Sequence, residues 1–354
     1  MRKEELKNNE SPKTIMITGA AGYVGAMLCD QFSKSPDLEK IIAIDLLPMP
    51  ELLRDNKKII WITANLSQNV WKIPALINKP GVIIHCAWAI KELYDQEDLQ
   101  KRLNIESSHV LFNFFFKNSF TKKLIYFSTI ASYGAHPENS LDNPFKEVDE
   151  LREGEFLYGL QKKIVEEDLR NLYEESLSVP REQVSDGAKQ VYVLRPSSIT
   201  GSRGRSLQTK KFGLLNLLKN ILPFIPVGGD KWCRQYIHED DITDIVAMFT
   251  FDGKKSNKGS HETYILSPND FVLANDMAKL FDKPVFIMPP ALLKFLFFLT
   301  WHLSKGKIPT SRGGWRFSSY PIPVDGSKIT CDYDFRYTYT SHEALTKDEG
   351  RYSE

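Results

Sequence analysis

The chain has 354 residues, of which 42% are hydrophobic and 26% charged, a composition typical of a globular protein with one large domain or two. Its 46 Lys and Arg side chains nearly balance its 45 Asp and Glu, so no overall field favours binding to nucleic acid or an anionic membrane. Cys29, Cys86, Cys233 and Cys331 form no Cys-x-x-Cys pair, which argues against a metal site or a disulfide framework and favours a cytoplasmic setting.

The first predicted elements are a strand, a glycine-rich turn and a helix. The apolar run 15–17 leads into a helical pattern through the turn Thr18-Gly19-Ala20-Ala21-Gly22-Tyr23-Val24-Gly25. Backbone N–H groups at the positive end of a helix dipole bind phosphate well. Gly19 allows the chain to reverse, Gly22 lets a phosphate approach, and Gly25 lets helix and strand pack closely. Glycines after a strand are also ordinary turn residues, so both interpretations stay open.

A second predicted strand, 40–45, ends in the carboxylate of Asp45. In a dinucleotide-binding fold, an acidic side chain about 20 residues after the glycines accepts hydrogen bonds from ribose hydroxyls and repels a 2′-phosphate. Asp45 therefore favours NAD over NADP. The alternative is an ordinary Asp that begins a turn after a strand.

Further apolar runs predict buried strands that alternate with helices, which indicates a doubly wound parallel sheet, the Rossmann type of α/β fold. Polar stretches at 132–154 and 174–190 are predicted to be a loop and a surface insertion. The predicted strands are 58–63, 81–87, 123–128 and 191–194, and the predicted helices include 110–116 and 156–172.

Ligands of such a sheet bind at the carboxyl ends of its strands, where Gly19, Asp45, His85 and Thr129 all fall. In the predicted helix that follows, Tyr158 and Lys162 are four residues apart and share one face. A neighbouring ammonium favours the phenolate, which would let Tyr158 exchange a proton with a substrate hydroxyl near neutral pH. Such Tyr–Lys pairs also occur on solvated helix faces, so the pair alone does not indicate a catalytic site and the other motifs are needed.

In their order along the chain, these motifs resemble the extended short-chain dehydrogenase/reductase family, of the NAD-dependent epimerase/dehydratase type. The resemblance runs from about Lys13 to Leu345. The matching segments are the glycine turn, Asp45, Asn65-Leu66, His85-Cys86-Ala87, Asn104, 128–134, Tyr158 with Lys162, Leu194-Arg195-Pro196 with Gly201, and 234–241.

The resemblance implies NAD as cofactor and hydride transfer at a secondary alcohol. Thr129 would bond the reacting oxygen, Tyr158 would be the general acid/base, Lys162 would lower its pKa and hold the nicotinamide ribose, and Asn104 would support the site. Ser128 would be a spectator. No metal ligand is implied. The implied cofactor contacts are Gly19, Gly22, Tyr23, Val24, Gly25, Asp45, Asn65, Leu66, Cys86, Ala87, Tyr158, Lys162 and Pro196.

Resemblance also bears on the reaction and on assembly. The family's sugar 4,6-dehydratases carry Asp-Glu after the catalytic Thr, whereas this chain has Ile130-Ala131, which argues against dehydration. Hydride return to the other face of the ketone would make the enzyme an isomerase, and release of the ketone would make it a dehydrogenase. A homodimer is expected because helix-mediated dimers are usual in such families.

The chain is predicted to divide into two functional parts. Residues 11–201 would form the NAD-binding Rossmann domain, with 232–267 returning to it. Residues 202–231 and 268–345 would form a smaller, mostly helical substrate-binding part, and 1–10 and 346–354 would be flexible tails. Residues 1–9 are charged and lack the apolar core of a secretory signal.

Two features of the sequence give opposing indications about a nucleotide-sugar substrate. Arg234 lies where nucleotide-sugar members bind a diphosphate, and arginines bind phosphate oxygens well. In contrast, 312–316 matches poorly the Arg-Arg-x-Gly-Asp stretch of sugar-nucleotide epimerases. A basic cluster is read either as a phosphate-binding or as a solvated loop, and it comprises Arg203, Arg205, Lys210 and Lys211.

The strongly apolar segment 291–303 is too short to span a bilayer, which requires about 20 residues. It is predicted to be a buried or substrate-covering helix, or else a helix lying in a membrane interface. It also resembles the hydrophobic segment of hydroxysteroid dehydrogenases of the same family.

Three hypotheses of function follow. The first is a nucleotide-sugar epimerase or dehydrogenase, based on Arg234. The second is a hydroxysteroid or lipid-alcohol dehydrogenase, based on 291–303. The third is a non-catalytic NAD(H) sensor, although such proteins commonly lose the Tyr or the Lys that this chain keeps as Tyr158 and Lys162.

Overall fold

Seven parallel strands form the central sheet of the computed structural model, which describes residues 11–178, 188–204, 221–252, 259–347 and 349–353. Their spatial order is β11-β6-β5-β4-β1-β2-β3. The predicted doubly wound fold is confirmed. The strands are β1 (Thr14–Thr18), β2 (Lys40–Asp45), β3 (Ile59–Thr63), β4 (Val82–His85), β5 (Lys123–Phe127), β6 (Gln190–Pro196) and β11 (Ser260–Leu266).

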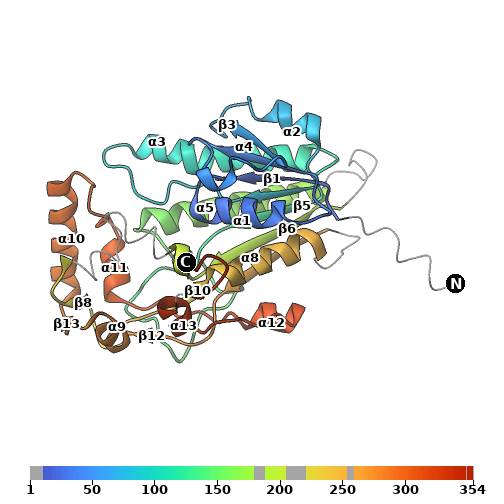
Figure 1. Ribbon diagram of the computed structural model, residues 1–354. Coiled ribbons are helices and arrows are strands. Elements are labelled where there is room, and N and C mark those ends of the chain that lie inside the picture. Colours follow the sequence, from blue (N-terminus) through green and yellow to red (C-terminus); the bar gives the residue numbers. More distant parts are fainter. Residues whose placement is uncertain (1–10, 179–187, 205–220, 253–258, 348, 354) are drawn as a thin grey trace.

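Helices cover both faces of this sheet (Figure 1). One face packs against α1 (Tyr23–Ser33), α8 (Glu239–Ala247) and the π-helical turn η5 (Met248–Asp252). The other face packs against α2 (Lys72–Asn78), α4 (Ser107–Lys117) and α5 (Leu157–Ser178). The short elements η1 (Glu51–Leu53), α3 (Glu97–Lys101), the π-helical η2 (Arg102–Glu106) and η3 (Ile130–Tyr133) lie in the connections.

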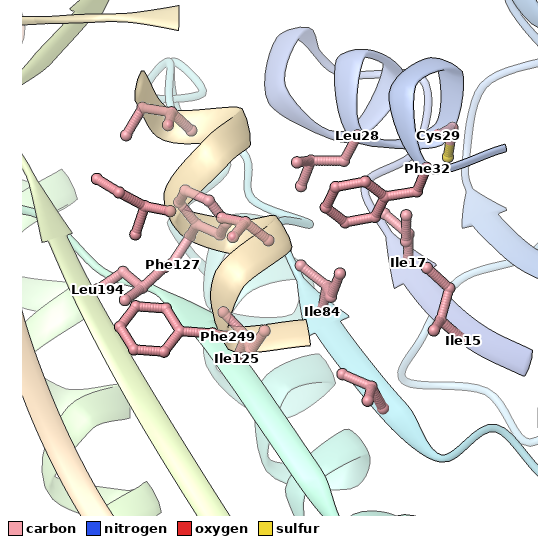
Figure 2. Close-up of a cluster of buried hydrophobic side chains, with 14 of the residues drawn as sticks. Ile15, Ile17, Leu28, Cys29, Phe32, Ile84, Ile125, Phe127, Leu194 and Phe249 are labelled. Atoms are coloured by element: carbon pink, nitrogen blue, oxygen red, sulfur yellow. The ribbon is translucent and has the colours of Figure 1, made fainter. Parts of the chain in front are cut away.

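Burial on both faces explains why the strands appear in the sequence as continuous apolar runs. Successive side chains of a strand point to opposite faces. In β1, Ile15 and Ile17 pack with Phe32 of α1 (Figure 2), whereas Met16 packs in the opposite cluster with Phe112 of α4. Each strand therefore contributes to two cores.

Outside the central sheet, the described residues form three two-stranded sheets. These are β7 (Ser198–Thr200) with β10 (Tyr236–His238), β9 (Cys233–Arg234) with β12 (Val272–Leu273), and β8 (Ile225–Val227) with β13 (Val285–Ile287). Further helices are α9 (Ala274–Phe281), α10 (Pro290–Ser304), α11 (Gly314–Ser319), α12 (Ser327–Tyr333) and α13 (Ser341–Thr346). The division into functional domains stays a prediction.

Two predicted boundaries differ from the structure because exposed turns carry no apolar period. Helix α5 continues to Ser178, so the predicted insertion at 174–190 begins as helix, and its residues 179–187 lie outside the described residues. The loop predicted at 132–154 starts inside the short helix η3.

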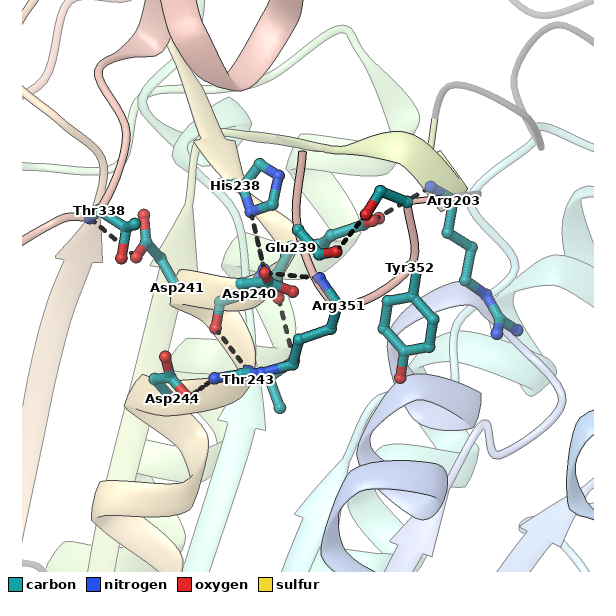
Figure 3. A network of polar contacts seen from close by, with 12 residues as sticks. Arg203, His238, Glu239, Asp240, Asp241, Thr243, Asp244, Thr338, Arg351 and Tyr352 are labelled. Atoms are coloured by element: carbon teal, nitrogen blue, oxygen red, sulfur yellow. Dashed lines mark hydrogen bonds and ion pairs between the residues drawn. The ribbon is translucent and has the colours of Figure 1, made fainter. Parts of the chain in front are cut away.

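Residues 349–353, predicted to be part of a flexible tail, lie against α1 and α8 (Figure 3). The Arg351 N–H donates to Asp240 Oδ2 at 3.0 Å, and its guanidinium pairs with Asp244 at 2.5 Å. The Tyr352 hydroxyl donates to Asp30 Oδ2 at 3.2 Å. The flexible-tail expectation is therefore corrected for these residues, whereas 1–10 lie outside the described residues.

Helix α10, predicted at 291–303 with burial as one interpretation, is only half covered. Leu293 and Trp301 are buried, while Phe295, Phe298 and Leu303 are 58%, 61% and 77% exposed. Burial of the whole helix is thus excluded. Among the described residues, no helix has both the length and the apolar character needed to cross a membrane.

Close packing of β1 on α1 provides a stability prediction. A Cβ atom on Gly25 would lie 2.1 Å from the Gly19 carbonyl oxygen, so Gly25→Ala is expected to lower the free energy of unfolding by about 1–3 kcal/mol. Urea denaturation measures this. Gly154→Ala is the control because no heavy atom lies within 4 Å of its added Cβ, and it should change stability by less than about 0.5 kcal/mol. Equal effects would contradict the packing argument.

Candidate functional site

The glycine turn lies where the strand order reverses, between β1 and β4. This is the position at which doubly wound sheets bind ligands. Gly19 has φ +71°, and its N–H donates to the Ile44 carbonyl at 2.8 Å. An added Cβ would lie 2.5 Å from the Ala87 nitrogen. Both the backbone conformation and the close approach therefore require glycine here.

The start of α1 offers backbone donors to an anion. Gly22 is its exposed N-cap and supplies no side-chain cap. The first backbone hydrogen bond onto Gly22 comes from the Ala26 N–H at 2.9 Å, so the N–H groups of Val24 and Gly25 have no partner within the helix. Together with the helix dipole, this geometry fits a pyrophosphate.

Tyr23 connects this turn with α8. Its hydroxyl donates to the Glu239 carboxylate, which also accepts the N–H groups of Arg203 and Gly204 at 3.1 and 3.0 Å (Figure 3 shows Arg203 and Glu239). The Tyr23 side chain is thus used to hold α1 against the segment that follows β7, and its backbone faces the turn.

Asp45 serves the glycine turn directly. Its Oδ2 accepts the Ala21 N–H and its Oδ1 accepts the Leu47 N–H, both at 2.9 Å. A carboxylate has about four acceptor positions, so two hydrogen bonds leave capacity for ribose hydroxyls. The two interpretations of Asp45, as a turn residue and as a ribose acceptor, are therefore compatible.

Asn65 and Leu66 lie in different environments, although both are predicted to contact the cofactor. The Asn65 Oδ1 accepts the N–H and the hydroxyl of Ser67, both at 3.0 Å, while its amide group has no hydrogen-bond partner within the described part of the chain and can serve a ligand. The Leu66 side chain packs in the core, and its carbonyl accepts the Trp71 indole N–H at 2.9 Å. The predicted cofactor contact of Leu66 could therefore involve only its backbone, because its side chain is in the core.

The last residue of β4 and the residues that follow it border the same edge of the sheet as the glycine turn, but they supply no general acid or base. His85 lies 2.7 Å from Thr18 Oγ1 and 2.9 Å from Ser108 Oγ, and burial lowers its pKa to about 3, so it stays neutral. Burial raises the pKa of Cys86 to about 12, with the nearby Lys162 opposing it. Cys86 and Ala87 therefore border the glycine turn as neutral walls.

Helix α5 is fastened to the end of β5 through one of its faces. Tyr158, Lys162 and Glu166 follow one another at four-residue intervals and so lie in one row. Lys162 donates to the Phe127 carbonyl, Glu166 accepts the Ser128 hydroxyl, and the Thr129 side chain is close enough to Tyr158 to act on its pKa. Thr129 and Tyr158, predicted as catalytic, are thus brought together, and Ser128, predicted to be a spectator in catalysis, makes a structural contact with Glu166.

Burial governs the electrostatics of this row. It lowers the pKa of Lys162 to about 7, against smaller opposing effects of Cys86 and Glu166. The Lys162 ammonium lies 3.7 Å from the centroid of the Trp88 ring, a contact that sequence reasoning missed. Burial also raises the pKa of Tyr158, whereas its bond with Thr129 acts the other way. The predicted lowering of the Tyr158 pKa by Lys162 stays a prediction, since burial and Thr129 are the two causes that act on Tyr158 here.

A buried ion pair holds the far end of the row. The Arg195 Nη2 and the Glu166 Oε2 are 2.6 Å apart, and both side chains are at most 4% exposed. Arg195 also donates to the Tyr133 hydroxyl at 2.7 Å. Pro196, predicted to contact the cofactor, follows directly at the buried end of β6. This ion pair ties β6 to α5.

Asn104 joins α5 to the loop after β4. It lies in the π-helical turn η2, an irregularity that often marks functional positions. Its Nδ2 donates to Gln161 Oε1 at 2.7 Å and to the Ala89 carbonyl at 3.2 Å, and its Oδ1 accepts the Ala89 N–H at 2.7 Å. Asn104 is therefore a positioning residue, and its partner Gln161 carried no signal in the sequence.

Arg234 lies apart from this group, on β9. Its guanidinium donates to the carbonyls of Cys233, at 2.8 Å, and Phe317, and lies 4.7 Å from the centroid of the Trp232 ring. Burial lowers its pKa. Among the described residues, no carboxylate pairs with it. Of the predicted basic cluster, only Arg203 is described, whereas Arg205, Lys210 and Lys211 lie outside the described residues.

A cavity of about 390 Å³ opens beside the start of α5. Its walls include Glu155, just before α5, and the aromatic side chains of Phe297, Trp301 and Trp315. A larger hollow of about 760 Å³, lined by charged residues such as Glu150 and Glu167, contains none of the predicted site residues. Among the described residues, no group of three or more His, Cys, Asp or Glu side chains is placed to hold a metal.

Comparison with protein families matches residues 15–263 to the NAD dependent epimerase/dehydratase family. No curated protein matches the chain in sequence. Among solved structures, the chain is similar to dTDP-glucose 4,6-dehydratase from Bacillus anthracis in complex with NAD, with 16% identity, a TM-score of 0.65 and 94% of both chains covered.

Two further structures are similar over nearly their whole length. One is the enzyme WbmG of Bordetella bronchiseptica in complex with NAD and UDP, with 18% identity, a TM-score of 0.65, and 95% of this chain and 93% of that chain covered. The other is UDP-glucose 4-epimerase of Thermotoga maritima with UDP-glucose, with 17% identity, a TM-score of 0.64, and 94% and 96% covered. At these identities the likeness establishes the fold.

The buried Lys162 provides a prediction about pH. Because its pKa in the folded protein is about 7, below the ordinary value of 10.5, the unfolded chain binds more protons between these values, and this residue's contribution to stability rises with pH there. Lys162→Met removes the group. We expect the mutant's stability, relative to the wild type, to be most favourable near pH 6 and to decline towards pH 10.

Urea denaturation at several pH values measures this difference. Lys163→Met is the control, because Lys163 is the next residue of the same helix and is only half-buried. A stability difference between Lys162→Met and the wild type that does not change with pH would contradict the desolvation argument.

Proposed function

Because the chain belongs to the NAD dependent epimerase/dehydratase family, we propose that it is an epimerase or dehydrogenase acting on a secondary alcohol of a nucleotide sugar. The observation that carries this proposal is the meeting of Tyr158 with Thr129 at the carboxyl end of β5, beside the glycine turn. It supports a proton-transfer pair at the same edge of the sheet as a turn suited to a dinucleotide.

The residues present fit NAD. The N–H groups at the start of α1 suit its pyrophosphate, the spare acceptor positions of Asp45 suit a ribose with a free 2′-hydroxyl, and Lys162 would hold the nicotinamide ribose. When bound, NAD supplies the hydride acceptor for the carbon that bears the hydroxyl.

Chain residues then carry the proton chemistry. Thr129 orients the alcohol oxygen, and the ionised Tyr158 accepts its proton as the ketone forms. In the reverse direction the phenol returns that proton. Burial raises the pKa of Tyr158 and so favours the neutral phenol before the alcohol proton is transferred. Ile130 and Ala131 offer no carboxylate to eliminate water, so epimerisation or simple oxidation is favoured over dehydration.

Arg234 supports a nucleoside diphosphate as part of the substrate. A guanidinium that is desolvated without a carboxylate partner gains most from an anion, and arginine binds phosphate oxygens in a bidentate manner. UDP in the WbmG structure and UDP-glucose in the Thermotoga epimerase agree with this class of ligand. Assembly as a homodimer and a cytoplasmic location stay predictions.

A second candidate substrate is an apolar secondary alcohol. The cavity of about 390 Å³ is walled by Phe297, Trp301 and Trp315, and aromatic walls suit a steroid or lipid alcohol. The same residues Thr129 and Tyr158 would serve either substrate, so the reaction class does not depend on this choice.

Replacing the phenol tests the catalytic assignment. Tyr158→Phe is expected to lower the rate of hydride transfer about 10²–10⁴-fold, because general acid/base catalysis contributes that much, while NAD binding persists. Net NAD reduction at 340 nm with UDP-sugars, dTDP-sugars and steroid alcohols measures oxidation, analysis of the sugar epimers measures epimerisation, and calorimetry gives NAD affinity. Tyr173→Phe, on the same helix, is the control. Retained turnover in Tyr158→Phe would refute the assignment.

Replacing the arginine tests the substrate class. Arg234→Gln is expected to weaken UDP-sugar binding about tenfold to a hundredfold, since a charge-assisted hydrogen bond contributes about 1.5–3 kcal/mol, and to leave NAD affinity unchanged. Equilibrium binding of UDP measures this. Arg336→Gln, an exposed arginine, is the control. Unchanged UDP affinity in Arg234→Gln would remove the basis for a nucleotide sugar and leave the apolar alcohol.

A further inference from the structure

Helix α10 carries two apolar stripes on different faces. Leu293, Phe297 and Trp301 are spaced by four residues and form the inner stripe, with Leu293 and Trp301 buried. The outer stripe follows the helical spacing i, i+3, i+4, i+7 and i+11 and consists of Leu292, Phe295, Leu296, Leu299 and Leu303. All five outer side chains are at least 37% exposed. The inner stripe anchors the helix, and the outer stripe faces solvent.

The exposed surface extends beyond the helix. Strand β13 directly precedes α10, and its residues Phe286 and Ile287 are 54% and 59% exposed. Helix α10 is the outermost helix at its end of the molecule (Figure 1). Monomeric proteins rarely leave such large contiguous apolar surfaces exposed unless a partner or a membrane covers them.

The charge of this segment indicates what covers it. Residues 283–307 contain no Asp or Glu but four lysines, Lys283, Lys294, Lys305 and Lys307. Lys294 is held near Glu155, at 3.8 Å, whereas Lys305 and Lys307 are exposed at the end of the helix. An apolar stripe bordered by lysines and free of acidic residues is complementary to an anionic lipid surface.

We propose that α10 and β13 form a docking surface for an anionic lipid bilayer, with the outer stripe inserted among the acyl chains and Lys305 and Lys307 among the headgroups. At 15 residues the helix is about 22 Å long, too short to span the bilayer, so it lies along the interface. A two-fold symmetric dimer through this face would place the same acid-free, lysine-bearing segment against itself. Charge thus favours the bilayer over a second copy.

Vesicle flotation of the full chain tests the proposal. The wild type is expected to float with vesicles of phosphatidylcholine containing about one-third phosphatidylserine, and less with phosphatidylcholine alone. The double variant Leu296→Gln/Leu299→Gln is expected to lose at least about tenfold in partitioning, because two inserted leucines become polar. Lys305→Gln/Lys307→Gln is expected to lose about fivefold per lysine on the anionic vesicles only.

Ile73→Gln/Ile77→Gln on α2 is the matched control, since it removes two isoleucines that are 64% and 73% exposed on another helix, and it should float like the wild type. Failure of the wild type to float with anionic vesicles would overturn the proposal. So would equal flotation of the Leu296→Gln/Leu299→Gln variant. A change from dimer to monomer in that variant, without vesicle binding by the wild type, would assign the surface to a second copy instead.

Discussion

The attachment of α5 to the end of β5 is the contact on which the site depends. A row of side chains spaced by one helical turn reaches three consecutive residues of the strand end. Because β5 belongs to the same sheet as β1, which leads into the glycine turn, this attachment fixes the distance between the proposed proton-transfer residues and that turn. Two further contacts hold this helix in place. Glu166, at the far end of the row, pairs with Arg195, and the neighbouring Gln161 is bonded to Asn104. Catalytic geometry here is a property of the packing between elements, not of one loop.

The same burial that fixes the geometry sets the protonation states. Lys162 loses much of its preference for the charged form, and Tyr158 is held as a neutral phenol. Neither shift follows from the spacing of the two residues on the helix, which suggests mutual stabilisation of the ions. Desolvation acts on each group separately and is the largest cause of both pKa shifts. Burial therefore favours the neutral form of both side chains.

Sequence reasoning succeeded where the signal was local. The sheet followed from apolar runs, and the turn from three glycines whose spacing reflects close backbone contacts. It failed where two partners are distant in the chain, because no periodicity predicts such pairs. The missed pairs are Trp88 with Lys162, Gln161 with Asn104, and Arg195 with Glu166. For α10, an apolar composition showed a helix but not which face would be covered. The docked residues 349–353 were missed because polar contacts leave no apolar pattern.

Arg195 and Arg234 differ in whether a carboxylate inside the fold neutralises their charge. Arg195 is buried at the end of β6 and has Glu166 as its counter-ion, so its charge is satisfied inside the fold. Arg234 is half-buried, and within the described part of the chain its guanidinium meets two carbonyls and aromatic rings but no carboxylate. Carbonyl dipoles offset less of a positive charge than a carboxylate does. A fold that leaves one guanidinium in this state gains from an external anion, and this difference between the two arginines is the physical argument for a phosphate-bearing substrate.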